Sequence, residues 1–264
     1  MKKFKLVLLI IITIVLVAIT GILIGLAIHG NLYNKNSKNP IVTLDISGYW
    51  EVQIELYPEY APNTVLNFIN LINKGYYNGK TFYGKDINAI YAAKNQEGEI
   101  VEPTLSLIDS SIETGSEVDM DYQINGEFIA NGFDKNTLKH EKGVISMLRD
   151  EYSSYFGLTK EGYNSASSGF QIMLDTNRNL NGLYTGFGKV VEGLNIVEKI
   201  FEIEEKEVEE NEENVSTGIT ELKTPAIIKN ATVETFGISY EVPEVHQAFD
   251  YEAYLQNYFN AYSN

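Results

Sequence analysis

The strongest hydrophobic signal in the chain is an uninterrupted apolar run near its N-terminus. Residues 6–28 form 23 consecutive positions without a charged side chain. As an α-helix this run would be about 34 Å long, slightly more than the roughly 30 Å hydrocarbon core of a bilayer. The pattern therefore predicts a transmembrane helix over residues 6–28, preceded by a short N-terminus at residues 1–5.

Charges flanking this run predict its orientation. Three lysines and the amino group precede it, whereas only two lysines follow it before residue 40. Because positive flanks stay on the cytoplasmic side, we expect a single-pass plasma-membrane protein whose C-terminal domain is extracytoplasmic. A cleaved signal peptide is the alternative, although its apolar region usually runs about 7 to 15 residues. Residues 29–40 are polar and predict a short linker.

From residue 41 the pattern changes to the alternation typical of β-strands. Residues 41–46 and 51–56 alternate apolar and polar side chains around a turn at Ser47 and Gly48. Two such runs joined by a tight turn predict a hairpin with one buried face.

Two helices are predicted from apolar residues spaced three and four apart. Asn63 is the candidate N-cap of the first, whose apolar positions run from Val65 to Ile72 and which Gly75 ends. The second covers residues 193–201. We expect both helices to pack through these apolar faces and to carry no chemistry.

The last segment, residues 237–264, is a C-terminal extension rich in aromatic side chains. Within it, tyrosine and phenylalanine recur at spacings of three and four, which predicts a helix over residues 248–262 with an aromatic face. This face would either pack against the rest of the domain or bind a partner.

Charge and composition narrow the class of protein. The formal net charge is −16 at pH 7, and the 15 basic and 36 acidic residues after Pro40 carry −21. Such a surface repels phosphate backbones and argues against nucleic-acid binding. The chain has no cysteine, so disulfides and thiolate metal sites are excluded. Lysine outnumbers arginine 18 to 2, a bias typical of AT-rich bacterial genomes.

Other candidate reactive residues have uninformative spacing. The three histidines lie far apart in sequence, so we expect no metal site and no cofactor. Asp119, Asp121 and Glu127 are neighbours in sequence, but nothing specifies an acid and base pair, and we expect them to face water. Residues 201–214 contain eight glutamates and one lysine, which predicts a solvated loop.

Several blocks between residues 41 and 236 resemble, in the same order, the cyclophilin-type peptidyl-prolyl isomerases. They are VQIELYPEYAPNTVLNFINLINKGYYNGKTF at 52–82, GVISM at 143–147, NSASSGFQI at 164–172 and LNGLYTGFGKVVEGLNIVEKI at 180–200. The resemblance implies one mainly β domain at 41–236, a closed antiparallel barrel of about eight strands capped by two α-helices. It also implies isomerisation without cofactor or metal, acting on proline-containing segments of secreted or surface proteins.

The positions that would carry the chemistry depart from the family's pattern. Its phenylalanine, histidine, arginine run becomes Phe82, Tyr83 and Gly84. Continuing the alignment puts the next groove positions and a glycine pair at Ala89, Ile90, Ala92, Ala93 and Lys94. Rotation about an X-Pro bond crosses a barrier of about 18 to 20 kcal/mol, and losing one preorganised donor costs about 10² to 10³ in rate. We therefore assign no catalytic residue.

The resemblance also implies a substrate groove formed by Leu148, Arg149, Gly169, Gln171, Leu180 and Tyr184. Gly169 stands where the family has glutamine, and Gln171 where it has phenylalanine. A guanidinium at Arg149 could bind a peptide carbonyl, but related bacterial sequences carry arginine there beside the catalytic one, which favours a peripheral role. Tyr184 is either a groove wall or an ordinary half-buried strand residue.

These residues predict a membrane-tethered isomerase domain with weak or lost activity on extracytoplasmic polypeptides. The alternative is a non-catalytic, chaperone-like or peptide-binding module at the cell surface. A third class is a purely structural envelope protein.

Overall fold

The computed structural model describes residues 39–152, 156–206 and 218–262. The predicted N-terminus, transmembrane helix and most of the linker lie outside these residues, as do residues 207–214 of the predicted acidic loop. No helix of the described part is long and apolar enough to cross a membrane. The chain divides into two compact units, residues 1–38 with 236–238 and residues 39–235 with 239–264. All elements below belong to the second unit.

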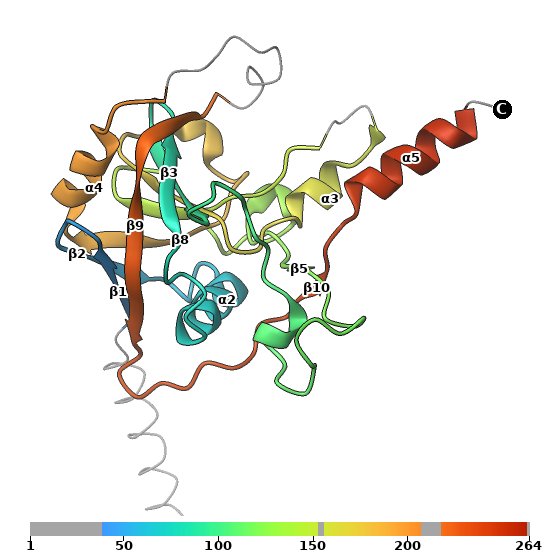
Figure 1. Cartoon of the computed structure of the whole chain (residues 1–264), viewed down its shortest axis with the longest axis horizontal. Coiled ribbons are helices and arrows are strands. Elements are labelled where there is room, and N and C mark those ends of the chain that lie inside the picture. The colour runs from blue at the N-terminus through green and yellow to red at the C-terminus, as the bar shows by residue number, and fades with distance from the viewer. Residues whose placement is uncertain (1–38, 153–155, 207–217, 263–264) are drawn as a thin grey trace, which may run out of the picture. The chain divides into compact units, whose positions relative to one another are not determined.

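Eight strands of this unit close into an antiparallel barrel (Figure 1), which confirms the predicted barrel. Their order around the barrel is β1-β2-β8-β6-β7-β4-β3-β9. The strands are β1 (Ile41–Ile46), β2 (Glu51–Leu56), β3 (Thr81–Lys85), β4 (Ala89–Lys94), β6 (Val144–Met147), β7 (Phe170–Met173), β8 (Gly186–Glu192) and β9 (Thr220–Glu234).

The first hairpin shows why the alternating sequence forms a barrel wall. Every second residue of β1 and β2 is fully buried, and each such aliphatic side chain contributes about 1.5 to 3 kcal/mol. The predicted turn is present: the Tyr49 N–H donates to the Ile46 carbonyl at 2.9 Å, and Gly48 has φ of 78°, which favours glycine.

The two predicted helices are present as α2 (Pro62–Asn73) and α4 (Leu194–Phe201). Each buries its apolar positions in the main core, including Phe68 of α2 and Val197 of α4. Shorter elements lie outside the barrel: α3 (Thr159–Tyr163) and the 3₁₀ turns η1 (Leu105–Leu107), η2 (Ile129–Asn131) and η4 (Arg178–Leu180).

The start of α2 differs from the prediction. Ala61, not Asn63, is the N-cap residue, and it provides no side-chain cap. Glu127 caps the helix from a distant loop: its carboxylate accepts the N–H groups of Asn63 and Thr64 at 2.9 and 2.8 Å and the Thr64 hydroxyl at 2.7 Å. The Asn63 side chain instead binds the backbone of Glu244. Glu127 is 5% exposed, so the expectation that it faces water is wrong.

The C-terminal extension packs within the unit. Its strand β10 (His246–Gln247) pairs with β5 (Tyr122–Gln123) of the long loop before β6. Helix α5 (Tyr251–Tyr262) follows, starting three residues later than predicted because the Asp250 carboxylate caps the Ala253 N–H at 2.8 Å. The predicted aromatic face lies against Tyr152 and Phe156.

Candidate functional site

A second apolar cluster, separate from the main core, covers the outer face of β3, β4, β6 and β7. Its buried members are Tyr83, Ala89, Tyr91, Val144 and Met173. Half-buried residues of the surrounding loops pack against them: Leu138, Leu148, Leu180 and Ile219. We call these nine residues the outer cluster. It contains two of the predicted groove residues, Leu148 and Leu180.

The direction of the β4 side chains corrects the sequence alignment. Ile90 and Ala92 lie in the main core, so they cannot line a groove outside the barrel. Ala89, the first of the aligned groove positions, does face outward, and so does Tyr91. A shift of one residue exchanges the two faces of a strand, and the register between β3 and β4 is irregular on both sides of Phe82.

Ala93 supports the position of the family's glycine pair. Its φ is 95°, a left-handed conformation that favours glycine. The chain therefore keeps a left-handed backbone conformation near the end of β4, although alanine occupies this position.

Gly84 stands where the family has its arginine, and neighbouring atoms fill the space beside it. A Cβ atom at this position would lie 2.9 Å from Ile219 Cγ2 and 3.0 Å from the Thr220 carbonyl oxygen. Both distances are shorter than normal van der Waals contact, and the carbonyl belongs to β9, which pairs with Gly84. The strand β9 thus closes against β3 where the family's arginine side chain would leave the backbone.

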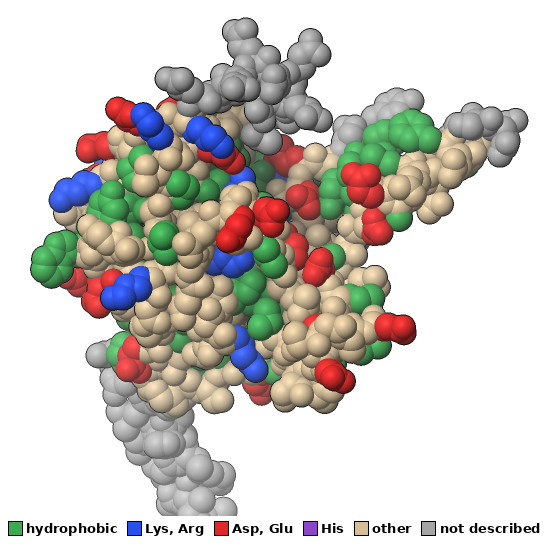
Figure 2. All heavy atoms as spheres, viewed as in Figure 1, with side chains coloured by type: hydrophobic (Ala, Val, Ile, Leu, Met, Phe, Trp, Pro, Cys, Tyr) green, Lys and Arg blue, Asp and Glu red, His purple; other side chains and the backbone are tan. Residues whose placement is uncertain are grey.

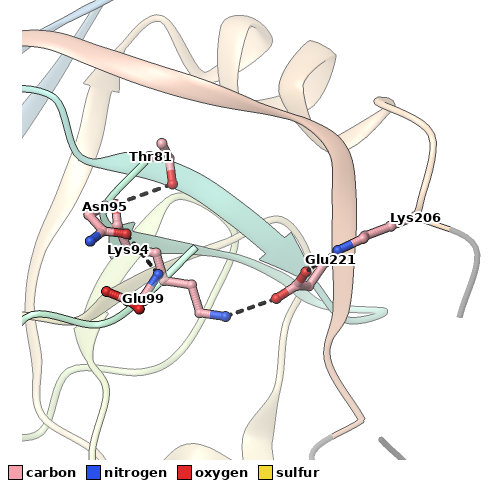
Figure 3. Close-up of polar contacts among 6 residues, drawn as sticks. All are labelled: Thr81, Lys94, Asn95, Glu99, Lys206 and Glu221. Carbon is pink, nitrogen blue, oxygen red and sulfur yellow. Dashed lines mark hydrogen bonds and ion pairs between the residues drawn. The ribbon is translucent and has the colours of Figure 1, made fainter. Parts of the chain in front are cut away.

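Two lysines lie at this strand pair. Lys85 of β3 donates its Nζ to the carbonyls of Phe201 and Ile203 at 2.8 and 2.9 Å, and Lys94 of β4 is the second. The Nζ of Lys94 lies 4.5 Å from the centre of the Tyr83 ring and 2.9 Å from Glu221 Oε1. Figure 3 shows the ion pair of Lys94 with Glu221. Lys206 reaches the other oxygen of Glu221 at 3.5 Å. Lys94 and Lys206 lower the pKa of the Glu221 carboxyl. Lys94 is therefore held in an ion pair across β4 and β9.

Arg149 is enclosed by its own surroundings. Its Nε donates to the Leu183 carbonyl at 3.1 Å, its Nη1 donates to the Asp150 carbonyl at 3.0 Å, and the guanidinium carbon lies 4.3 Å from the centre of the Tyr184 ring. Only 9% of the side chain is exposed. Two of its five N–H donors are thus bonded to backbone carbonyls, and its peripheral role in a groove stays a prediction.

The structure brings the other predicted groove residues together only in part. Leu148 and Leu180 belong to the outer cluster, and Tyr184 stacks on Arg149 and donates its hydroxyl to Glu151. Burial, then the bond to Glu151, raises the pKa of Tyr184. Gly169 lies against the Leu148 side chain, and Gln171 is 2% exposed on β7. Gln171 is flanked by Tyr91 of β4 and Ser146 of β6 in the sheet, and its burial keeps its side chain from contact with solvent.

A buried polar group behind the outer cluster has the residue types of a hydrolytic triad. His140 Nε2 lies 3.0 Å from Ser146 Oγ, and His140 Nδ1 lies 3.2 Å from Asn181 Oδ1. Ser146 is fully buried and His140 is 1% exposed. A nucleophile must reach its substrate, so this group joins the η4 loop to β6 and does not perform hydrolysis.

Burial lowers the pKa of His140 from its ordinary value of 6.5, and the bond to Asn181 opposes this only partly. The unfolded chain therefore binds a proton more readily than the folded chain. The free energy of unfolding therefore contains a contribution from keeping His140 neutral in the folded chain. This contribution is fully present above pH 6.5 and is lost as the pH falls through and below that value.

We expect the stability of the wild-type chain to fall relative to a His140→Gln variant as the pH drops from 7.5 to 5.5. Urea unfolding at several pH values measures this difference. Buried carboxyls with raised pKa values, such as Glu102 and Glu127, act in the opposite direction but are common to both chains. A difference that does not change with pH would contradict the assignment.

One cavity of about 300 Å³ lies beside this region, between the loop after β6 and α3. It is lined by Arg149, Asp150, Glu151, Tyr152, Thr159, Gly162 and Tyr163. The sequence analysis singled out only Arg149 of these residues. The described residues hold no group of three histidine, aspartate or glutamate side chains arranged for a metal ion.

Comparison with known proteins identifies the family. A family model described as "Cyclophilin type peptidyl-prolyl cis-trans isomerase/CLD" matches residues 41–224. The chain therefore belongs to the cyclophilin-type peptidyl-prolyl cis-trans isomerases, as the resemblance implied.

Similar curated proteins carry isomerase names. Peptidyl-prolyl cis-trans isomerase B of Bacillus subtilis is 31% identical over 144 residues, covering 54% of this chain and 78% of the relative. Peptidyl-prolyl cis-trans isomerase-like 2 of Gibberella zeae is 29% identical over 150 residues, covering 57% of this chain. The matched part spans only 21% of that longer fungal protein.

Solved structures share the fold. The crystal structure of a Cryptosporidium parvum cyclophilin-type isomerase, determined in the presence of the dipeptide Ala-Pro, matches with a TM-score of 0.51 at 19% identity. The match covers 74% of this chain and 98% of that one. At this identity the similarity establishes the barrel and its connectivity.

Proposed function

We propose that this chain is a membrane-tethered cyclophilin-type domain that binds proline-containing segments of polypeptides outside the plasma membrane, with prolyl isomerisation weak or absent. Family membership supports the ligand class. The crystallised Cryptosporidium neighbour was studied with an Ala-Pro dipeptide, which is the simplest such ligand. The tether is supported by the apolar run at residues 6–28 and its positive flank.

The single observation that supports weak or absent turnover is the close packing of β9 against Gly84. Isomerisation needs a fixed donor beside the amide as it loses planarity, and no cofactor supplies one. Glycine has no donor side chain, and the contacts of Ile219 and Thr220 occupy the space that a larger residue would need. Loss of one preorganised donor costs about 10² to 10³ in rate.

The nearest cations do not replace that donor. Lys85 donates to two backbone carbonyls, Lys94 is paired with Glu221, and Arg149 is bonded to two backbone carbonyls. A paired cation is a weaker donor to a substrate amide, because binding the substrate would first require breaking its existing bonds.

A non-catalytic binding module at the cell surface is the second candidate, and the outer cluster favours it. Tyr83 and Tyr91 are each 8% exposed where the family's groove would be open. Their burial leaves little room for a proline ring above β3 and β4. Binding would then use the neighbouring loops around Tyr184 and the cavity beside Arg149.

The test is an exchange measurement on the full chain in lipid nanodiscs. We expect the rate of cis–trans exchange of an Ala-Pro peptide, followed by NMR, to be at least about 10²-fold lower than with the Bacillus subtilis relative at equal concentration. Peptide resonances that shift without faster exchange would support the binding module. Turnover within tenfold of that relative would overturn the proposal of weak or lost activity.

A further inference from the structure

The cavity beside Arg149 has aromatic side walls. The Tyr163 ring is held from behind by Phe128, with ring centres 5.2 Å apart. On the opposite side, Tyr152 stacks on Tyr251 of α5 with ring centres 4.8 Å apart and an angle of 18° between the ring planes. Tyr251 lies beyond the part of the chain that matches the family. The C-terminal extension therefore positions one wall of this cavity, from residues outside the part of the chain that matches the family.

The charge at the cavity is net negative. Asp150 and Glu151 are exposed, and 71% of the Glu151 side chain is accessible. The positive charge of Arg149 is sunk between the rings of Tyr184 and Tyr163, at 4.3 and 5.2 Å, and its Nη2 lies 3.7 Å from Glu151. The cavity lining thus carries two accessible carboxylates and one enclosed guanidinium.

The surface around the cavity is also negatively charged. Residues 95–134 contain ten acidic residues, residues 239–262 contain four, and neither segment contains lysine or arginine. The two segments are joined through β5 and β10. In Figure 2, acidic side chains are visible near α5, while the basic side chains of this face lie over the barrel. An approaching anion would be repelled and a cation attracted.

The volume of the cavity and the side chains that line it indicate which kind of cation would fit. A volume of about 300 Å³ is at the lower end of ligand pockets and suits one long side chain rather than a folded surface. Aromatic faces next to carboxylates bind ammonium and guanidinium groups through cation–π attraction and charge pairing. Lysine and arginine side chains also carry an apolar stem that packs along tyrosine rings.

We propose that this cavity receives a lysine or arginine side chain of the bound polypeptide, with Asp150 and Glu151 pairing its charge and Tyr152 and Tyr163 enclosing its stem. This inference rests on the proposed function and deepens it, because it names the client class as basic, proline-containing segments. The arrangement selects among polypeptides by a residue beside the proline.

The experiment compares matched peptides on the full chain in nanodiscs of zwitterionic lipid. Each peptide contains one Ala-Pro unit and, at one of three positions on either side of it, lysine, norleucine or glutamate. Norleucine keeps the stem and removes the charge. We expect the best lysine peptide to bind about five- to thirtyfold more tightly than its norleucine counterpart at low salt. This ratio should shrink at high salt, because part of the attraction is screened.

Paired variants locate the effect. Asp150→Asn with Glu151→Gln keeps oxygen acceptors for the Tyr152 and Tyr184 hydroxyls but removes both charges, and it should abolish the preference for lysine. Asp175→Asn with Glu192→Gln changes two exposed carboxylates that do not line the cavity, and it should leave the preference intact.

The outcomes separate the two proposals. If proline peptides bind but norleucine or glutamate serves as well as lysine, the cavity assignment is wrong while the proposed function stands. The same conclusion follows if the double variant keeps the lysine preference. If no proline peptide binds, whatever its charge, the proposed function fails and the cavity assignment fails with it.

Discussion

Replacing Glu127 by alanine is expected to lower the free energy of unfolding by about 2 to 3 kcal/mol. The carboxylate is the cap of α2 and accepts two N–H groups and one hydroxyl there. Its removal would leave these donors without partners in a buried place. Burial raises the pKa of Glu127, so the cost of desolvating the charge offsets part of the gain and keeps the expected loss moderate.

Urea unfolding at pH 7 measures this loss. Asp134→Ala is the matched control, since Asp134 is an exposed acidic residue of the same loop and should change stability by no more than about 0.5 kcal/mol. Glu127→Gln should fall between the two, because the amide retains one acceptor oxygen but turns an NH₂ group toward the helix. A Glu127→Ala chain as stable as the Asp134→Ala chain would show that another group caps α2.

Restoring arginine at position 84 is expected to damage the fold instead of reviving catalysis. The new side chain would collide with Ile219 and the backbone at Thr220, and overpacking of this kind costs about 1 to 3 kcal/mol. Prolyl exchange should stay at the wild-type level, because the buried rings of Tyr83 and Tyr91 still fill the outer face. Thermal unfolding and the peptide exchange rate measure the two effects.

Two further variants serve as controls for this prediction. Ser110→Arg adds arginine at an exposed site and should leave the unfolding temperature unchanged. Gly84→Arg combined with Ile219→Ala removes the closer side-chain collision and should recover part of the stability without raising turnover to the level of the Bacillus subtilis relative. A stable Gly84→Arg chain with brisk turnover would mean that β9 yields easily and that the groove is intact.

The barrel fold and the catalytic site depend on different residues, and only the first set has been kept in this chain. The barrel needs alternating apolar residues and tight turns, and this chain has kept both in β1, β2 and the helices that cap the barrel. Catalysis needs a few polar groups at fixed points on the outer face. On that face, glycine at position 84 provides no donor side chain, and the ring of Tyr91 is buried. The outer cluster therefore resembles a small second core.

Local pattern was sufficient for much of this molecule. Alternation predicted the first hairpin, spacing of three and four predicted α2, α4 and most of α5, and the collinear blocks predicted the family and its barrel. The loss of the arginine at Gly84 was also visible, since it follows directly from the Phe82 landmark. Each of these inferences depends on residues that are neighbours in sequence, where chain geometry alone relates one side chain to the next.

Tertiary contacts decided the remaining features. The cap of α2 comes from Glu127, 63 positions beyond Thr64, and no local signal marks it. Ile90 and Ala92 were placed wrongly in the groove, because which β4 side chains meet the core depends on a strand pairing whose register beside β3 is irregular on both sides of Phe82. Closure of the site at Gly84 by Ile219, and the tyrosine wall supplied by α5, likewise depend on segments that only the folded chain brings together.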